Sequence, residues 1–352
     1  MARIPPYEAG RPIEEVARSV GLDPATVIKL ASNESPIPPF PEVIEAIAAA
    51  SAGSNRYPDN DWYQLAAAVA EVLEIHPDHL MFGGGTSELL RVASLAVGGE
   101  ATSAVYPWPS FIIYRIGSVL AGSTTIEVPL TADHHLDLDA MAGAVRGDTT
   151  IVFLCNPNNP TGTHRSAADV TRFIDSMNER TLVVVDEAYF EYVTAPDFGS
   201  AIDLAVSRPN VVVLRTFSKI YSLASLRVGY AIGQPSTLAD LRRAQAPFTV
   251  SGLAQVAAAT AVRYPQRVEE RARFNAAERS RIEQELRLLG VEFVPSQANF
   301  VFLRPEGVEE GAFDDFLQLG VIVRQFGKGW IRVTIGSVEE NDRFLRALSS
   351  LL

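Results

Sequence analysis

The sequence predicts an α/β fold in which a large domain, built on a mainly parallel sheet flanked by helices, is joined to a smaller α+β domain. Two observations support this prediction. Between about residues 102 and 232, short apolar runs alternate with stretches of helical spacing, which is typical of a parallel sheet with crossover helices. Several of these runs are apolar throughout instead of alternating, as expected of strands that are covered on both faces.

The expected elements follow in order along the chain. A Pro-rich arm leads to a short helix with apolar residues at helical spacing from Ile13 to Val20, and helices are expected at 41–50, where Pro41 suits the first turn, and at about 62–74. The strands expected for the large domain lie at 80–82, 104–106, 124–128, 151–154, 182–185, 211–214 and 228–232. A long helical region at about 253–289, interrupted near Pro265, precedes further short strands at 299–303, 321–324 and 330–335, a helix at about 311–319 and a terminal helix from Val338.

The chain length favours two domains. At 352 residues the chain exceeds the size at which a single core usually stops growing. We expect residues 30–245 to form the large, cofactor-binding domain. Residues 1–29, together with 246–352, are expected to form the smaller domain that closes over the substrate, with the crossing between the two near 246–252.

Composition argues against several classes of function. The 42 Asp and Glu residues outnumber the 30 Lys and Arg residues, the formal net charge is −12, and no long basic run suits a nucleic-acid backbone. The single cysteine, Cys155, excludes an intrachain disulfide, and no apolar stretch reaches the roughly 18–20 residues that span a bilayer. The beginning of the sequence has no apolar signal region, so we expect a cytoplasmic protein without nucleic-acid or membrane partners. The histidines lack zinc-binding spacing, so no metal is expected.

A glycine turn at 83–85 lies between an expected strand and an expected helix. Gly85, Thr86 and Ser87 stand where the first amide groups of that helix would point at a ligand, and the positive end of a helix favours a bound phosphate. The plainer alternative is a tight turn in which a serine or threonine caps the helix. The turn alone does not choose between these two interpretations.

Polar residues follow three consecutive apolar runs. The runs are followed by an Asn-rich turn with Asn159, by Asp186 with Tyr189, and by Thr216, Ser218 and Lys219, with Arg227 a little further on. Each has an ordinary explanation in turn or cap chemistry. Because ligands bind at the carboxyl ends of parallel strands, the conjunction of all three indicates a site at one edge of the sheet.

These residue types suit pyridoxal phosphate, which needs a lysine, an acid facing the pyridine nitrogen, groups on the ring oxygen and donors to the phosphate. Lys219 would form the Schiff base and move the substrate proton, and Asp186 would keep the ring nitrogen protonated. Asn159 and Tyr189 would hydrogen-bond the ring oxygen, and Phe111 could stack on the ring. The phosphate would be bound by amide groups, hydroxyls and a guanidinium at Gly85, Thr86, Ser87, Thr216, Ser218 and Arg227.

The same motifs identify a family resemblance. The sequence resembles the fold-type-I pyridoxal phosphate aminotransferases and, within them, the histidinol-phosphate aminotransferase branch. The matching stretches span nearly the whole chain in order and lie at 29–34 (KLASNE), 56–59 (RYPD), 158–162 (NNPTG), 186–189 (DEAY), 216–219 (TFSK), 226–230 (LRVGY), 297–300 (QANF) and 331–334 (IRVT).

The resemblance implies further roles. It implies a homodimer in which Tyr57 reaches the cofactor phosphate of the neighbouring subunit. Arg332 would bind the α-carboxylate of an amino-acid substrate, a bidentate task that suits arginine. The substrate would also meet Arg324, the N-terminal Tyr7, and Asn33 of the first matching stretch. The sequence departs from the family pattern at a few positions, namely Ser87 in place of a common aspartate, and Ser222 and Ser225 in place of the usual glycines after the lysine.

Several activities fit this resemblance. The first is transamination between histidinol phosphate and 2-oxoglutarate, which would place the protein in histidine biosynthesis. The second is transamination of aromatic amino acids, since both donors need an apolar pocket and an arginine. A more distant alternative is a decarboxylase or lyase on the same fold, whose products would differ. A non-enzymatic binding protein is disfavoured by the combination of Lys219, Asp186 and Arg227.

Overall fold

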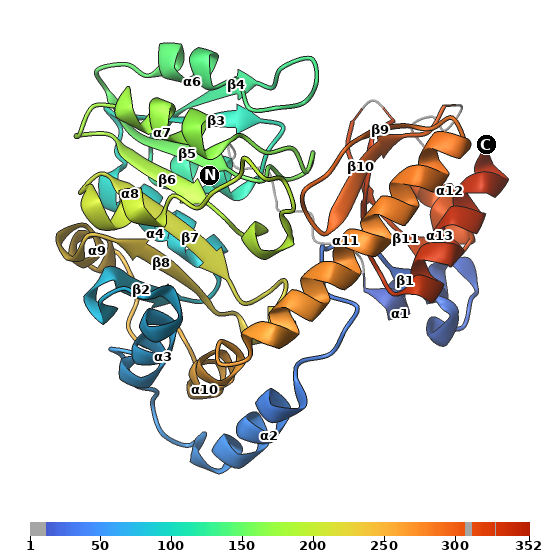
Figure 1. Cartoon of the computed structure of the whole chain (residues 1–352), viewed down its shortest axis with the longest axis horizontal. Coiled ribbons are helices and arrows are strands. Elements are labelled where there is room, and N and C mark those ends of the chain that lie inside the picture. Colours follow the sequence, from blue (N-terminus) through green and yellow to red (C-terminus); the bar gives the residue numbers. More distant parts are fainter. Residues whose placement is uncertain (1–11, 307–311, 328) are drawn as a thin grey trace.

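The computed structural model describes residues 12–306, 312–327 and 329–352, and within them the largest sheet has seven strands in the order β2-β8-β7-β6-β5-β3-β4 (Figure 1). The strands of this large sheet are β2 (Leu80–Gly83), β3 (Ser103–Trp108), β4 (Thr124–Pro129), β5 (Thr149–Cys155), β6 (Leu182–Asp186), β7 (Val211–Thr216) and β8 (Gly229–Gly233). Each expected strand is present, with boundaries that differ by one or two residues.

The large sheet is mainly parallel, as predicted. Neighbouring strands from β4 across to β7 run parallel, whereas β8 runs antiparallel to both β7 and β2. Every residue of β6 and of β7 is buried, which explains why these runs are apolar throughout instead of alternating. The parallel strands β5, β6 and β7 therefore deliver the residues that follow them to one edge of the sheet.

Helices cover the large sheet and share one hydrophobic core with it (Figure 1). They are α2 (Pro41–Ala50), α3 (Tyr63–Leu73), α4 (Thr86–Val97), α5 (Ile113–Leu120), α6 (Leu138–Ala144), α7 (Ala167–Asp175), α8 (Ile202–Ser207), α9 (Pro235–Arg242) and α10 (Gly252–Ala261). Short 3-10 turns lie at η1 (Pro24–Thr26), η2 (Ser51–Gly53), η3 (Pro77–His79), η4 (Phe190–Tyr192) and η5 (Ala224–Leu226). The division into two domains at residue 245 stays a prediction. The helix that follows this position, α10, packs against α2 and α3.

The smaller part combines a four-stranded antiparallel sheet with a two-stranded parallel one, as far as the described residues extend. Its elements are β1 (Ile28–Lys29), β9 (Glu292–Val294), β10 (Phe300–Arg304), β11 (Val321–Ile322), β12 (Arg324–Gln325), β13 (Ile331–Thr334), α1 (Ile13–Val20), α12 (Ala312–Gln318) and α13 (Val338–Leu351). The prediction of one strand over 321–324 was wrong. The chain changes sheets at Val323, because β11 pairs with β1 from the N-terminal segment while β12 pairs with β13.

One long helix, α11 (Pro265–Leu288), runs from the large sheet to the small one (Figure 1). It packs against η4 beside the large sheet and against α13, β9 and β10 of the smaller part. Polar side chains that are buried along this helix include Arg271, Asn275 and Arg279. The break that Pro265 predicted separates α10 from α11, since proline suits the first turn of a new helix.

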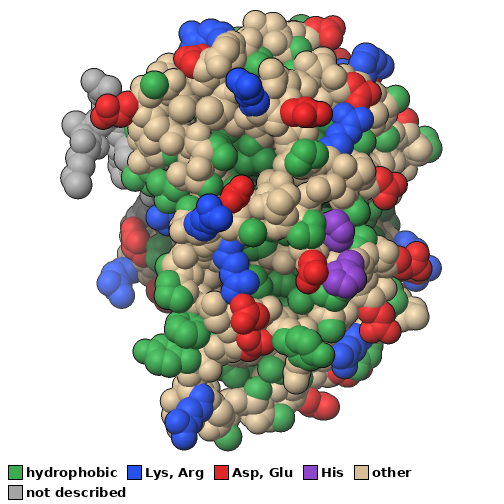
Figure 2. Space-filling view, turned by 90° about the vertical axis from the view of Figure 1, so that its left-hand side faces the viewer, with side chains coloured by type: hydrophobic (Ala, Val, Ile, Leu, Met, Phe, Trp, Pro, Cys, Tyr) green, Lys and Arg blue, Asp and Glu red, His purple; other side chains and the backbone are tan. Residues whose placement is uncertain are grey.

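The surface shows a mixture of charges. In the part of the chain that the structure describes, no helix is both long and apolar enough to cross a membrane. On the face of the molecule seen in Figure 2, acidic and basic side chains are interspersed, and the basic ones form no extended area there. That face therefore offers no continuous basic surface to a phosphate backbone.

Candidate active site

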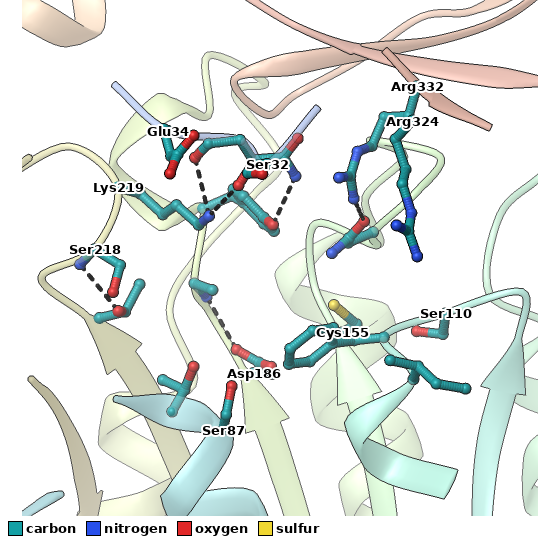
Figure 3. A pocket seen from close by; sticks show the side chains of 18 of the residues that line it. Ser32, Glu34, Ser87, Ser110, Cys155, Asp186, Ser218, Lys219, Arg324 and Arg332 are labelled. Carbon is teal, nitrogen blue, oxygen red and sulfur yellow. Dashed lines mark hydrogen bonds between the residues drawn. The ribbon is translucent and has the colours of Figure 1, made fainter. Parts of the chain in front are cut away.

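A cavity of about 550 Å³ lies at the carboxyl edge of the large sheet, where residues of the small sheet also line it (Figure 3). Most side chains that the sequence pattern singled out come together here. The lining residues that were predicted are Asn33, Thr86, Ser87, Phe111, Asn159, Asp186, Tyr189, Thr216, Ser218, Lys219, Arg227, Arg324 and Arg332. Three predicted residues are not among those that line the cavity. Gly85 lies against the guanidinium of Arg227, and Tyr57 lies outside the cavity lining. Tyr7 lies outside the described residues.

Lys219 comes three residues after the end of β7, and its amine points into the cavity (Figure 3). The Nζ atom donates hydrogen bonds to the backbone carbonyls of Ser32 at 3.1 Å and Asn33 at 2.9 Å. Burial of the amine, assisted by the nearby guanidinium of Arg332, lowers the pKa of Lys219 to about 7. A large share of this amine is therefore neutral near pH 7, which is the form that attacks a carbonyl.

Asp186 ends β6 at the bottom of the cavity and is 2% exposed. Its Oδ2 atom accepts a hydrogen bond from the hydroxyl of Tyr114 at 2.9 Å, and its Oδ1 atom accepts one from the amide of Ala188 at 3.2 Å. Burial raises the pKa of Asp186 to about 6, and the two hydrogen bonds oppose this rise. A buried carboxylate in this position could pair with a protonated ring nitrogen.

Hydroxyls and a guanidinium gather where α4 begins and β7 ends. Thr86 and Ser87 open α4, whose N-cap is Gly85 with φ of 83° and without a side-chain cap. The plainer alternative, in which a serine or threonine caps this helix, is therefore wrong, because the backbone at the N-cap is left-handed and favours glycine. Across the cavity edge, Arg227 donates to Ser218 Oγ at 3.4 Å.

Two glycines make room for this group of donors. A Cβ atom on Gly85 would collide with the guanidinium of Arg227, and one on Gly229 would lie 2.9 Å from the amide nitrogen of Thr86. Hydroxyls, a guanidinium and a helix N-terminus are together the donors that a phosphate group requires. The donor set and the space cleared by the glycines fit the phosphate of a bound cofactor.

Arg332 and Arg324 enter the cavity from the small sheet. Arg324 in β12 and Arg332 in β13 are directly opposite each other in the antiparallel pairing of these strands. Figure 3 shows both guanidiniums on one side of the cavity, across from Ser218. Arg332 donates to the backbone carbonyl of Ala31 at 2.7 Å and to Oδ1 of Asn159. Two cations on adjacent strands repel one another, so an anion between them is favoured.

Asn33 links the small sheet to residues at the carboxyl edge of the large sheet. It adopts a left-handed backbone with φ of 53°, and its Nδ2 atom donates to the hydroxyl of Tyr189 at 3.0 Å. Its backbone amide donates to Thr334 Oγ1 at 2.9 Å, and its carbonyl also accepts from Asn299 Nδ2 at 3.2 Å. Asn33 thereby contacts Tyr189, Lys219 and the last strand of the small sheet at once.

Some residues of the site were not predicted. Tyr114 of α5 binds Asp186, and the buried Cys155 pairs with Asp186 across β5 and β6 and lines the cavity. Burial raises the pKa of Cys155 to about 12, so it is a neutral thiol. A weak signal for Tyr114 was available, because a tyrosine within an apolar stretch must find a partner for its hydroxyl when it is buried.

Comparisons with known proteins agree with this geometry. The family model for aminotransferases of class I and II matches residues 25–348. The chain belongs to this family. An aromatic amino acid aminotransferase of Rhodococcus jostii is 43% identical over 324 residues, covering 92% of this chain and 90% of that protein. A histidinol-phosphate aminotransferase of Moorella thermoacetica is 40% identical over 354 residues, covering 99% of this chain and 91% of that protein.

A solved structure supports the same conclusion. The histidinol-phosphate aminotransferase of Sinorhizobium meliloti, in complex with pyridoxal-5'-phosphate, superimposes with a TM-score of 0.90 at 27% identity, covering 100% of this chain and 98% of that chain. The aminotransferase described here has the fold-type-I architecture and uses pyridoxal phosphate. The neutral amine of Lys219, the buried acid Asp186 and the donors around Thr86 and Arg227 provide the chemical groups that this cofactor needs.

Proposed function

We propose that this aminotransferase transfers the amino group of histidinol phosphate to 2-oxoglutarate, and so acts in histidine biosynthesis. The observation that carries the proposal is the placement of Arg324 opposite Arg332 at one side of the cofactor cavity. Two guanidiniums at one place suit substrates with anionic groups, and both histidinol phosphate and glutamate carry anions that an arginine binds well.

The proposed roles at the cofactor follow from position. Lys219 carries the cofactor, Asp186 holds a proton at the ring nitrogen, and Asn159 and Tyr189 contact the ring oxygen. Gly85, Thr86, Ser87, Thr216, Ser218 and Arg227 bind the phosphate, and Phe111 covers the ring. Pyridoxal phosphate supplies the electron sink for the carbon that loses its proton.

Lys219 is also the proposed acid and base. Once the substrate amine displaces it, its free amine can take the proton from the substrate Cα and return it to the cofactor carbon. A pKa of about 7 suits both directions, because a group with a pKa near the working pH both accepts and donates protons efficiently. The carbonyls of Ser32 and Asn33 hold this amine inside the cavity.

The substrate side is assigned to the small sheet. Arg332 is proposed to bind the α-carboxylate of glutamate, and Arg324 the phosphate of histidinol phosphate or the distal carboxylate of glutamate. Asn33 supports this side through Tyr189 and Thr334, and Tyr7 is proposed to contact the substrate as well. The aromatic and apolar lining formed by Trp108, Ile112 and Phe326 suits a flat ring.

That same lining supports a second candidate, an aromatic amino acid aminotransferase. The phenyl ring of phenylalanine would meet the surface that receives an imidazole ring, and the relative from Rhodococcus jostii carries that name. The two donors differ in charge, because the phosphate of histidinol phosphate can carry two negative charges and can engage both arginines, whereas the carboxylate of phenylalanine carries one.

A homodimer is part of the proposal. Tyr57 is 84% exposed and stacks on Phe248, which is itself 43% exposed, with ring centroids 4.8 Å apart. Exposed aromatic pairs are favourable anchors for a protein partner. We propose that a second copy of the chain covers them and receives the hydroxyl of Tyr57 at its cofactor phosphate.

The deciding experiment offers a panel of amino donors to the holoenzyme, with 2-oxoglutarate as acceptor, and measures glutamate formed by each. Histidinol phosphate is expected to show kcat/KM at least about tenfold above phenylalanine and tyrosine. A preference of the same size for phenylalanine or tyrosine would make aromatic transamination the function. Release of carbon dioxide without glutamate would indicate a decarboxylase.

A further inference from the structure

The serine at position 222 has an unusual backbone. It has φ of 60°, in the left-handed region that favours glycine, three residues after the catalytic lysine. Its amide donates to the carbonyl of Lys219 at 3.0 Å, which closes a tight turn over Lys219–Ser222. A glycine would relax this backbone, whereas the side chain of Ser222 makes a contact that glycine lacks.

That contact is with Arg271. The Nη1 atom of Arg271 donates to Ser222 Oγ at 2.8 Å and to the carbonyl of Ile220 at 2.7 Å. Both acceptors belong to the turn that begins at Lys219. The guanidinium therefore holds this turn at two points.

The other end of the same guanidinium contacts a different segment. Nη2 donates to the carbonyl of Pro38, and the guanidinium carbon lies 4.1 Å from the ring centroid of Phe40. The segment that ends in Pro38 and Phe40 begins with Ser32 and Asn33, whose carbonyls accept the amine of Lys219. Arg271 thus joins the turn that bears the lysine to the segment that receives its amine.

The charge of Arg271 is unusual for a structural residue. The side chain is 7% exposed, and its acceptors are neutral oxygens. Burial lowers the pKa of Arg271 to about 10, and the neighbouring groups that act on that pKa are Tyr192 and Arg267, neither of which is a carboxylate. Burying a cation is costly, and among the described residues no ion pair with a carboxylate offsets that cost, so the three hydrogen bonds and the contact with Phe40 must do so.

We propose that Arg271 is a positioning residue for Lys219: by bridging the Lys219–Ser222 turn and the Ser32–Pro38 segment, it fixes where the lysine amine stands in the cofactor cavity. Arginine is suited to this task because the two terminal nitrogens of its rigid planar fork donate to acceptors on different segments, whereas lysine offers one flexible ammonium without a fixed fork. The inference concerns the attachment of Lys219 and holds whichever amino donor the enzyme uses.

Two variants test the proposal. Arg271→Lys keeps the charge and loses the fork, and Ser222→Gly removes the acceptor while relieving the left-handed backbone. Arg267→Lys is the matched control for the first, because Arg267 lies one turn earlier on α11, over Phe40, and pairs with Glu42. Ser225→Gly is the control for the second, because Ser225 is an exposed serine in the same loop.

The position of the amine is read from Lys219 itself. In the cofactor-free protein, the pH dependence of Lys219 acetylation is followed by peptide mass spectrometry, and in the holoenzyme the pH midpoint of the cofactor absorbance is measured. Loosening the turn exposes the amine to water, so we expect the apparent pKa of Lys219 to rise in both variants. Because the amine is then less well placed, kcat should fall about tenfold or more. The KM for the amino donor should change less than about twofold.

Thermal unfolding distinguishes an effect on the position of the Lys219 amine from an effect on the stability of the fold. Ser222→Gly is expected to unfold no earlier than the wild type, because relief of the backbone offsets the lost hydrogen bond. If Arg271→Lys does not fold, Ser222→Gly decides alone. The proposal is overturned if the pKa of Lys219 and the holoenzyme midpoint stay at their wild-type values, or if the control variants move them equally.

Discussion

The Nζ atom of Lys219 lies 2.9 Å from the backbone carbonyl oxygen of Asn33, and the side chain of Asn33 donates a hydrogen bond to the hydroxyl of Tyr189. One residue of the N-terminal segment thereby contacts two groups delivered by neighbouring strands of the large sheet. Because the carbonyls of Ser32 and Asn33 are acceptors only, they hold the lysine amine whether it is neutral or charged. The charge state of the amine is then decided by its burial and by the cations around it.

Lys219 should react as a neutral amine near pH 7. In the cofactor-free protein we expect its acetylation to be half-maximal at pH about 7, well below the ordinary lysine value of 10.5, because burial and the guanidinium of Arg332 disfavour the ammonium. The chain has three lysines, so each acetylated peptide is readily assigned. A midpoint above about 9 would contradict the burial of this amine.

The same pKa predicts a dependence of stability on pH. Since the folded pKa of Lys219, about 7, lies below the unfolded value, 10.5, the unfolded chain binds more protons between these limits. The free energy of unfolding of the cofactor-free protein, measured against Lys219→Met, should therefore rise between pH 7 and 10.5, and this contribution is lost progressively as the pH falls from 10.5 to about 7. If the difference in the free energy of unfolding between the wild type and Lys219→Met does not change across this pH window, the pKa of Lys219 is not lowered in the folded protein.

Lys219→Ala should abolish covalent attachment of the cofactor. Reduction of the holoenzyme with borohydride, followed by mass spectrometry, is expected to find the cofactor on the peptide that contains Lys219, and on no peptide of the variant. Lys29→Ala is the control, since Lys29 forms a surface ion pair with Glu34. An unchanged absorbance spectrum in Lys219→Ala would remove the lysine from its proposed role.

Asp186→Asn should bind the cofactor but transaminate slowly. A neutral amide cannot hold a proton on the ring nitrogen, and the loss of a preorganised charge in a buried site is worth several kcal/mol, so turnover should fall roughly 100-fold or more. Tyr114→Phe keeps the carboxylate and removes one hydrogen bond to it, so its effect should be smaller, at about tenfold or less. Turnover of Asp186→Asn within about threefold of wild type would mean that another acid faces the ring.

Local sequence patterns predicted the parts of the site that sit at strand ends. Asn159, Asp186 and Lys219 each follow an apolar run, and parallel pairing of β5, β6 and β7 brings such residues to one edge without further information. The pattern also located the break before α11 at Pro265. These features depend on residues that are close in sequence.

Contacts between distant segments escaped prediction. Asn33 meets Tyr189 across 156 positions and Lys219 across 186, and Arg271 meets Pro38 across 233. Neither spacing nor composition reports such pairings, because the register between segments that are distant in sequence is set by tertiary packing. The split of 321–324 into β11 and β12 has the same origin, since the partner of β11 comes from the N-terminal segment.

Tyr57→Phe should weaken cofactor binding in the proposed dimer. We expect the cofactor dissociation constant to rise about tenfold, the loss expected for one hydrogen bond to a charged phosphate, while Tyr63→Phe, another exposed aromatic at 79% exposure, changes it little. Sedimentation should give twice the chain mass of 38.2 kDa.

Mixed dimers test whether Tyr57 acts across the interface. If Tyr57 acts across the interface, a dimer of one Lys219→Ala chain and one Tyr57→Phe chain contains one site in which both residues are native. Half of the sites in such a mixed dimer should therefore bind the cofactor tightly. No recovery on mixing, or a monomeric protein, would show that Tyr57 acts within its own subunit or not at all.

The last prediction concerns the choice of substrate and rests on the two arginines that face each other across β12 and β13. If Arg324 binds the phosphate of histidinol phosphate, Arg324→Ala should cost about 2–4 kcal/mol, which is roughly 30- to 900-fold in kcat/KM for that donor, expressed mainly in KM. Phenylalanine offers only a singly charged carboxylate, which Arg332 would bind, so its kcat/KM should fall much less. Gln325→Ala is the matched control, because Gln325 is the next residue along β12 and also lines the cavity. Steady-state kinetics with both donors decide between the roles: equal losses for histidinol phosphate and phenylalanine would show that Arg324 shapes the pocket and does not recognise the phosphate.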